Sequence, residues 1–222
     1  MTSAVPAWRR ESEGELRWPV TGVVLITVLA QFTIPRAFAL GPTWLMPGLE
    51  LSMLGALVVL NPGQIRLPHL HLRWLSLAMT AAMTTDNVVS ALRLIDGLLT
   101  GRVSNDPVTL LRVGSTIWMI NVVVMALWYW ELDRGGASSR ARNVRDHFDF
   151  LFPQMANPDF AHADWEPRFL DYFYTSFTNA TAFSPTDVLP LTRWAKVLMM
   201  LQSMVSLSTV ALVIARAVNT FH

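Results

Sequence analysis

Long apolar blocks separated by short polar stretches constrain the fold of this chain more than any other feature of its sequence. A bilayer core about 30 Å thick is crossed by a helix of about 20 apolar residues, and several blocks approach that length. Hydrophobic residues make up 52% of the 222 residues, and charged residues make up 15%. A soluble domain carries about 25% charged residues. We therefore expect an all-α, polytopic membrane protein with about five transmembrane helices, surrounded by the lipid bilayer.

The apolar blocks divide the chain into three regions. Residues 1–18 form a polar N-terminal tail that lacks the cleavage site and short apolar core of a signal peptide. Residues 19–100 form a three-helix membrane region, with apolar segments at about 20–40, 45–60 and 74–99. Residues 101–222 comprise a helix at 108–132, a polar loop at 133–165, a short helix at 167–183, an irregular stretch at 184–190 and a last helix at 192–218.

The composition also excludes several classes of function. The chain has no cysteine, so it can form neither a disulfide nor a thiolate metal site. His69 and His71 have no third candidate ligand nearby, so we expect no metal site. The net charge of +1 gives no electrostatic reason for a nucleic-acid partner. No nucleophile–base pair or phosphate-binding loop is recognisable in the sequence, so we do not expect an enzyme.

The third apolar segment contains an unusual number of polar residues. Asp86, Ser90 and Arg93 recur at intervals of four and three residues, which places them on one face of a helix. Ionisable side chains at membrane depth are costly and usually face a bundle interior or water. We expect Asp86 and Arg93 to form a buried structural pair, and a substrate or proton path is the alternative.

A break in helical structure follows the short helix at 167–183. Its aromatic part, residues 169–183, is too short to cross a bilayer. Pro185 disfavours helical backbone at Ser184, so the next residues must be irregular. Irregular backbone at membrane depth requires surrounding protein or water. The pattern predicts a re-entrant loop, in which the chain enters and leaves the membrane on the same side.

The same stretch resembles a known family. The run DYFYTSFTNATAFSPTDVLPLTRWAK is similar to the pore signature of potassium channels, in which an aromatic pore helix leads to T-V-G-Y-G-D and then a proline. The resemblance covers about residues 108–218 and implies an outer helix, a pore helix, a filter loop and an inner helix. It also implies a homotetramer in a bacterial plasma membrane, because one copy of the loop cannot enclose a pore. The matching positions are Tyr174, Ser176, Phe177, Thr181, Asp187 and Pro190.

The chain departs from that family in the selectivity filter. Where the family has T-V-G-Y-G-D, both glycines are absent here. A filter of backbone carbonyls needs those glycines, because its backbone angles are costly for other residues. We expect side-chain ligands and a weakly selective cation channel, with no cofactor other than a permeating monovalent cation. The candidate pore and filter residues are Thr181, Ala182, Phe183, Ser184, Pro185, Thr186 and Asp187, with Ser176 and Asn179 in the pore helix.

Polar side chains also mark one face of the last helix. Gln202, Ser206 and Thr209 are spaced by four and three residues, and the opposite face is formed by Met, Leu and Val. We expect this stripe either to line a conduction pathway or to pack helices together through hydrogen bonds. The alternative to a channel is a non-conducting membrane scaffold, or a partner subunit, that reuses the same fold.

The distribution of arginine indicates an orientation. With five crossings and a cytoplasmic N-terminus, ten arginines face the cytoplasm and three face outside, which agrees with the positive-inside rule. This topology places the loop at 184–190 on the cytoplasmic side, opposite to its side in potassium channels. The ten are Arg9, Arg10, Arg17, Arg66, Arg73, Arg134, Arg140, Arg142, Arg145 and Arg168, and the three are Arg36, Arg102 and Arg112.

Overall fold

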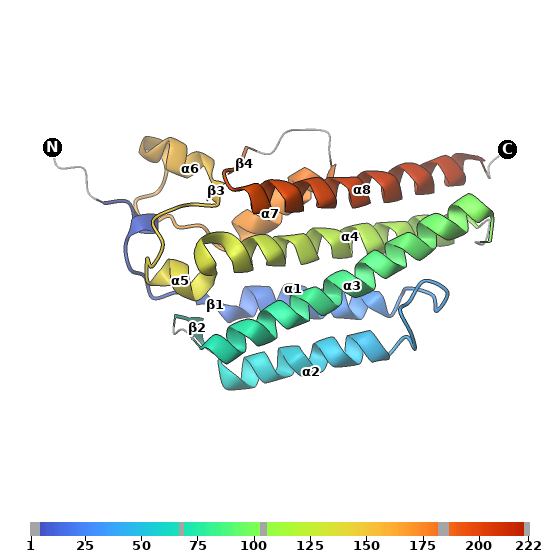
Figure 1. Ribbon diagram of the computed structural model, residues 1–222, viewed down its shortest axis with the longest axis horizontal. Helices are drawn as coiled ribbons and strands as arrows, with labels where there is room; N and C mark the ends of the chain where they lie inside the picture. The colour runs from blue at the N-terminus through green and yellow to red at the C-terminus, as the bar shows by residue number, and fades with distance from the viewer. Residues whose placement is uncertain (1–4, 67–68, 103–105, 182–186, 220–222) are drawn as a thin grey trace.

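The structure is a computed structural model that describes residues 5–66, 69–102, 106–181 and 187–219. Within these ranges most residues are helical, and the long helices lie side by side in an elongated bundle (Figure 1). The long helices are α1 (Arg17–Gln31), α2 (Leu45–Leu60), α3 (Leu70–Thr100), α4 (Pro107–Leu132) and α8 (Arg193–Asn219).

Two helical stretches in the described residues are both long and apolar enough to cross a membrane. They are Pro107–Ala141, which contains α4, and Arg193–Arg216, which lies within α8. Helices α1 and α2 are apolar but have 15 and 16 residues, fewer than the roughly 20 needed for a perpendicular crossing. The helical fold is therefore confirmed, with two candidate membrane spans.

Helix α4 forms the centre of the bundle. It packs against α1, α3 and α8, and every residue from Ile120 to Leu127 is buried. Gly114 allows α8 to approach closely, because a Cβ atom here would lie 2.8 Å from a methyl group of Val213. Small residues at helix crossings permit this kind of tight packing between membrane helices.

The helix ends follow signals that are visible in the sequence. Asp106 caps α4 by accepting a hydrogen bond from the Thr109 backbone N–H at 3.0 Å, and Pro107 takes the first helical position. Gly101 ends α3 with a φ of 69°, a left-handed conformation that glycine adopts readily. Helix α1 ends at Gln31, earlier than the segment predicted at 20–40, and turns around Pro35 follow it.

Most of the arginines gather at one end of the bundle. Helices α1, α3 and α8 begin at this end, and α2 and α4 finish there (Figure 1). Strand β1 (Glu15–Leu16) pairs here with β2 (Gln64–Ile65), and β3 (Phe150–Leu151) pairs with β4 (Leu189–Pro190). The ten arginines predicted to share one side all belong to segments at this end, which we call the arginine-rich end. The three predicted for the other side belong to segments at the opposite end.

Part of the segment 133–165, predicted as a polar loop, is buried at the arginine-rich end, while residues 144–147 and 156–160 are exposed. The segment contains η2 (Asp133–Gly135), α5 (Ala137–Ala141), α6 (Pro153–Ala156) and η3 (Pro158–Phe160). Four of its charged residues are buried, because other groups of the fold give them hydrogen bonds or lie against them. They are Asp133, Arg134, Arg140 and Asp149.

Arg134 shows how this segment is fixed to the rest of the chain. Its φ of 51° is left-handed and unfavourable for a residue with a side chain. Its guanidinium donates to the carbonyl oxygens of Trp8 at 2.8 Å and Arg145 at 3.0 Å. Trp8 belongs to η1 (Ala7–Arg9), so this one side chain joins the N-terminal tail to the turn after α4. These hydrogen bonds offset the backbone cost, which is about 1–3 kcal/mol for such a conformation.

We predict that Val144 and Leu189 are accessible from the same side of the membrane, because both are exposed at the arginine-rich end. Each can be changed singly to cysteine in this cysteine-free chain and treated, in sealed vesicles, with a membrane-impermeant thiol reagent. The comparison is Val108→Cys, exposed at the opposite end of the bundle. If Leu189→Cys reacts from the same side as Val108→Cys, α7 and the residues after it cross the membrane.

Candidate functional site

Helix α7 (Phe169–Thr181) begins at the arginine-rich end and has 13 residues, against 27 in α8. The Phe169 backbone N–H donates to one carboxylate oxygen of Glu15 at 2.6 Å, and the Trp130 indole donates to the other at 2.7 Å. Burial raises the pKa of Glu15, and these two hydrogen bonds act in the opposite direction. Glu15 therefore connects the N-terminal tail, the start of α7 and the end of α4.

The chain is again at the arginine-rich end after α7. Phe150 of β3 lies opposite Pro190 of β4 in the antiparallel ribbon. The Trp194 indole at the start of α8 donates to a carboxylate oxygen of Asp149 at 2.9 Å. Figure 1 shows α7 extending from this end along part of α8. Helix α7 and strand β4 therefore lead into and out of the bundle at the same end.

The end of α7 lies beside the first half of α8. The Asn179 side-chain amide donates to the carbonyl oxygen of Met199, in the second turn of α8, at 2.9 Å. The Ser203 hydroxyl donates to the carbonyl oxygen of Asn179 at 3.3 Å. Helix α8 continues to Asn219, so α7 stops well before the far end of the bundle.

The side-chain amide of Gln202 is the centre of a buried polar network. Its oxygen accepts hydrogen bonds from the Tyr129 hydroxyl at 2.7 Å and from the Asn179 amide at 2.8 Å. Its nitrogen donates to the carbonyl oxygen and the hydroxyl of Ser176, at 2.9 and 2.6 Å. The Gln202 side chain is 1% exposed. One amide thus uses both its donors and both its acceptor sites to join α4, α7 and α8.

Two further contacts extend the network along α4. The Ser176 hydroxyl donates to the carbonyl oxygen of Val122 at 2.7 Å. The Asn121 amide donates to the Ser206 hydroxyl at 2.9 Å, one turn beyond Gln202 on α8. Because a buried polar group without a partner costs about 1–3 kcal/mol, these contacts fix the depth and rotation of α7.

The polar stripe of the last helix therefore faces the interior of the chain. Gln202, Ser206 and Thr209 are each at most 1% exposed, and the first two bond to neighbouring helices. Hydrogen-bonded helix packing accounts for the placement of Gln202 and Ser206, and the stripe lines no exposed surface of the single chain. Polar groups of α7 bind Gln202, a side chain that would otherwise be available to line a conduction pathway. The outward face of α8 carries Val197, Met200, Leu201, Met204, Leu207, Ile214 and Val218.

The structure describes the two ends of the predicted filter. The Thr181 hydroxyl donates to the carbonyl oxygen of Thr178 at 2.8 Å in the last turn of α7. Asp187 is exposed, two residues before β4. The predicted residues between them lie outside the described residues, namely Ala182, Phe183, Ser184, Pro185 and Thr186.

The expected pair of Asp86 and Arg93 is not buried as a unit. Asp86 is buried but Arg93 is exposed, and the ion pairs found in the described residues do not include them. Asp86 accepts a hydrogen bond from the Leu40 backbone N–H, and Arg93 donates to the carbonyl oxygen of Ala39. Both side chains thus bind the connection between α1 and α2, and the Asp86 carboxylate also interacts electrostatically with Arg93.

Sequence reasoning missed a group of buried charges beside α7. Asp133 accepts hydrogen bonds from the Tyr172 hydroxyl at 2.6 Å and from the Asp149 backbone N–H at 3.1 Å. The Arg140 guanidinium lies 4.9 Å from the centre of the Tyr172 ring and donates to the Asp133 carbonyl oxygen at 3.0 Å. Opposite charges within one short segment, close to aromatic residues, were the signal that could have indicated burial.

No family model, no curated protein and no solved structure matches this chain. A function for the chain is therefore inferred from the geometry and chemistry of its own residues.

We predict that Gln202→Leu destabilises the folded protein more than Ser206→Ala. Leucine is similar in size but leaves the Tyr129 and Asn179 donors without their acceptor. The free energy of unfolding in micelles should fall by about 2 kcal/mol for Gln202→Leu and by about 0.6 kcal/mol for Ser206→Ala. Ser208→Ala, on the exposed face of α8, is the matched control. Equal losses for the two serine variants would contradict the network.

We also predict that Tyr172→Phe lowers stability, whereas Tyr174→Phe does not. The first change removes the hydroxyl that donates to buried Asp133, at a cost of about 1–3 kcal/mol. Tyr174 is exposed two residues later on the same helix, so its change should stay within about 0.5 kcal/mol. Thermal unfolding of both variants in one detergent makes the comparison. Identical midpoints would show that the Asp133 contact contributes nothing.

Proposed function

We propose that this chain is a channel-like, multi-pass membrane protein in which α7 and the residues after it form a re-entrant loop. The observation that supports this most directly is the Gln202 network, which holds a half-length helix against α4 and α8. A short helix with an irregular return is tolerated at membrane depth only where protein or water surrounds it. The network supplies such surroundings on the inner side of α7.

In the proposed arrangement α1 to α4 and α8 cross the bilayer, and the arginine-rich end faces the cytoplasm. This orientation follows the positive-inside rule. Helices α1 and α2 are short for a crossing, and a bilayer accommodates such helices by local thinning and by snorkelling of flanking residues such as Arg17. The re-entrant loop then opens toward the cytoplasm, opposite to the potassium channels that the sequence resembles.

A pore in this arrangement lies between copies of the chain, as the resemblance to a tetrameric family implies. Gln202, Ser206 and Thr209 are buried inside each chain. The lining would therefore come from residues 182–187 and from the outward faces of α7 and α8. Hydroxyl groups and the Asp187 carboxylate are the ligands that this loop offers in place of a carbonyl stack. Such ligands favour cations over anions and separate sodium from potassium weakly.

A non-conducting scaffold, or a partner subunit of another membrane protein, is the second candidate. The outward face of α8 favours it, because that face consists mostly of methionine, leucine and valine. Apolar side chains of this kind pack against lipid or another helix and do not by themselves stabilise ions. In this function the loop after α7 would be a closed plug, and the fold would serve for assembly.

We predict cation currents with a sodium-to-potassium permeability ratio close to one when the purified oligomer is placed in a planar bilayer. Mobile hydroxyl ligands let each ion keep part of its hydration. Under a potassium chloride gradient, Asp187→Asn should move the reversal potential toward zero, because one carboxylate per chain is lost. Asp164→Asn removes an exposed charge from the loop before α7 and is the matched control, expected to leave the reversal potential unchanged.

Three other results would alter the proposal. A permeability ratio far below one would contradict the proposed hydroxyl ligands. An intact oligomer that passes no current under any condition would favour the scaffold. A monomer in mass measurements of the detergent-solubilised protein would contradict both functions that depend on assembly.

A further inference from the structure

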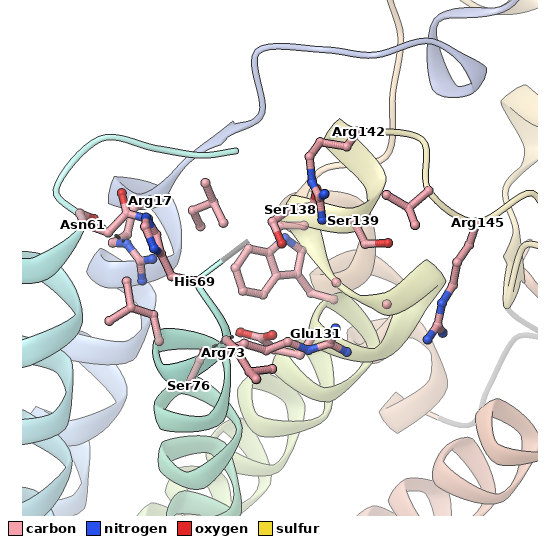
Figure 2. Close-up of a pocket in the computed structure, with 18 residues that line it drawn as sticks. Arg17, Asn61, His69, Arg73, Ser76, Glu131, Ser138, Ser139, Arg142 and Arg145 are labelled. Atoms are coloured by element: carbon pink, nitrogen blue, oxygen red, sulfur yellow. Dashed lines mark hydrogen bonds between the residues drawn. The ribbon is translucent and has the colours of Figure 1, made fainter. Parts of the chain in front are cut away.

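A cavity at the arginine-rich end lies apart from α7 and the Gln202 network (Figure 2). Its volume is about 280 Å³. It is enclosed by the starts of α1 and α3, the end of α4 and the segment around α5. Pockets for small ligands begin at roughly this size. The cavity therefore has room for a compact polar group.

Four arginines line this cavity, and one carboxylate opposes them. Figure 2 shows Arg17 on one side, Arg142 across from it, Arg73 at the base beside Glu131, and Arg145 at the far edge. They come from α1, from the turn after α5, from α3 and from the segment before β3. Three separate parts of the sequence contribute these residues, so the fold itself places four arginines around one cavity.

Glu131 cannot neutralise this concentration of positive charge. Its carboxylate is buried, accepts a hydrogen bond from the Ser76 hydroxyl and interacts electrostatically with Arg73 and Arg17. No ion pair involving Glu131 is found in the described residues. One negative charge against four guanidinium groups leaves the cavity positive.

Most of the guanidinium donors in the cavity are unused. Arg17 and Arg142 each donate their Nε–H to a backbone carbonyl, at 2.8 and 3.2 Å. Across the part of the chain that the structure describes, the guanidinium groups of Arg73 and Arg145 have no hydrogen bond or ion pair. Each guanidinium carries five N–H donors, arranged to bind two oxygens of a phosphate at once. The cavity thus offers more donors than the protein can satisfy.

Exposed tryptophans place the cavity at the level of lipid headgroups. Trp18 is 58% exposed and Trp74 is 64% exposed, and they directly follow Arg17 and Arg73 in the sequence. Exposed tryptophan side chains at helix ends are typical of the boundary between membrane and water. The cytoplasmic leaflet is rich in anionic lipids, and basic pockets between membrane helices bind their headgroups.

We propose that this cavity binds a phosphate group, which is attracted by the positive charge of Arg17, Arg73, Arg142 and Arg145 and held by the guanidinium groups nearest to it. The phosphate belongs either to the headgroup of an anionic phospholipid or to a small soluble phosphate. Ser138 and Ser139, which also line the cavity, supply hydroxyl groups for further hydrogen bonds. The proposal rests on the membrane orientation given above, and it does not depend on whether the protein conducts ions.

The test compares two double variants that remove the same charge. Arg142→Gln with Arg145→Gln removes two guanidinium groups from the cavity. Arg66→Gln with Arg168→Gln removes two exposed arginines at the same end that do not line it. Full-length protein is placed in nanodiscs of phosphatidylcholine with phosphatidylglycerol, extracted in mild detergent and examined by native mass spectrometry. The wild type and the control pair should retain phosphatidylglycerol, and the cavity pair should retain at least about tenfold less.

A second measurement separates the two sources of the phosphate. Thermal unfolding is followed in phosphatidylcholine nanodiscs with inorganic phosphate or chloride at equal ionic strength. If inorganic phosphate raises the midpoint temperature of unfolding for the wild type and the control pair, but not for the cavity pair, the site binds a soluble phosphate. If phosphatidylglycerol is retained selectively and phosphate does not raise the midpoint temperature, the site binds a lipid headgroup. If the two double variants behave alike in both measurements, the proposal is overturned. Neither readout involves ion current, so failure of the channel proposal would be seen separately.

Discussion

One buried side-chain amide determines how the C-terminal half of this bundle is arranged. Gln202 accepts from α4 and α7 and donates to α7, so three helices are joined at a single point inside the chain. In surroundings of low polarity, an unpaired donor or acceptor is costly, and few alternative packings would satisfy all of these groups together. The depth of α7 is therefore set by hydrogen-bond geometry as well as by its length.

The arginine-rich end adds a second constraint on α7. Buried Asp133 binds the Tyr172 hydroxyl, and Arg140 lies against the ring of the same residue. Asp149 binds both the Arg134 backbone and the Trp194 indole, which connects the turn after α4 with the start of α8. Charges are costly to bury unless they have partners, and here the partners come from segments on both sides of α7. The short helix is thus held at its start as well as along its length.

The sequence indicates the helices well, because their signals are local. Apolar blocks, the Asp106–Pro107 start and the Gly101 stop are each visible within a few residues, and the structure places helix ends close to them. The direction in which a polar stripe faces, in contrast, depends on residues that are distant in the sequence. Gln202 and Ser206 share a helical face, but whether that face meets water or another helix depends on Asn121 and Tyr129, about 80 residues earlier.

The surroundings of charged residues were the hardest feature to predict, because their partners also lie far away in the sequence. Asp86 and Arg93 have a spacing that suits a pair, yet backbone groups at Ala39 and Leu40 take their hydrogen bonds. The segment from Asp133 to Asp149 has the composition of a solvated loop, yet four of its charged residues are buried, partly by contacts with the N-terminal tail and α7. Competition between distant partners decides such cases, and a local pattern does not contain those partners.

The Gln202 network also constrains the order in which the helices can be buried during synthesis. Helix α7 leaves the ribosome before β4 and α8, so its Ser176 and Asn179 side chains at first lack their Gln202 partner. It is also too short to settle across a bilayer as an independent unit. In the proposed membrane arrangement, insertion of α7 must therefore wait for α8, the helix that supplies its buried partner Gln202.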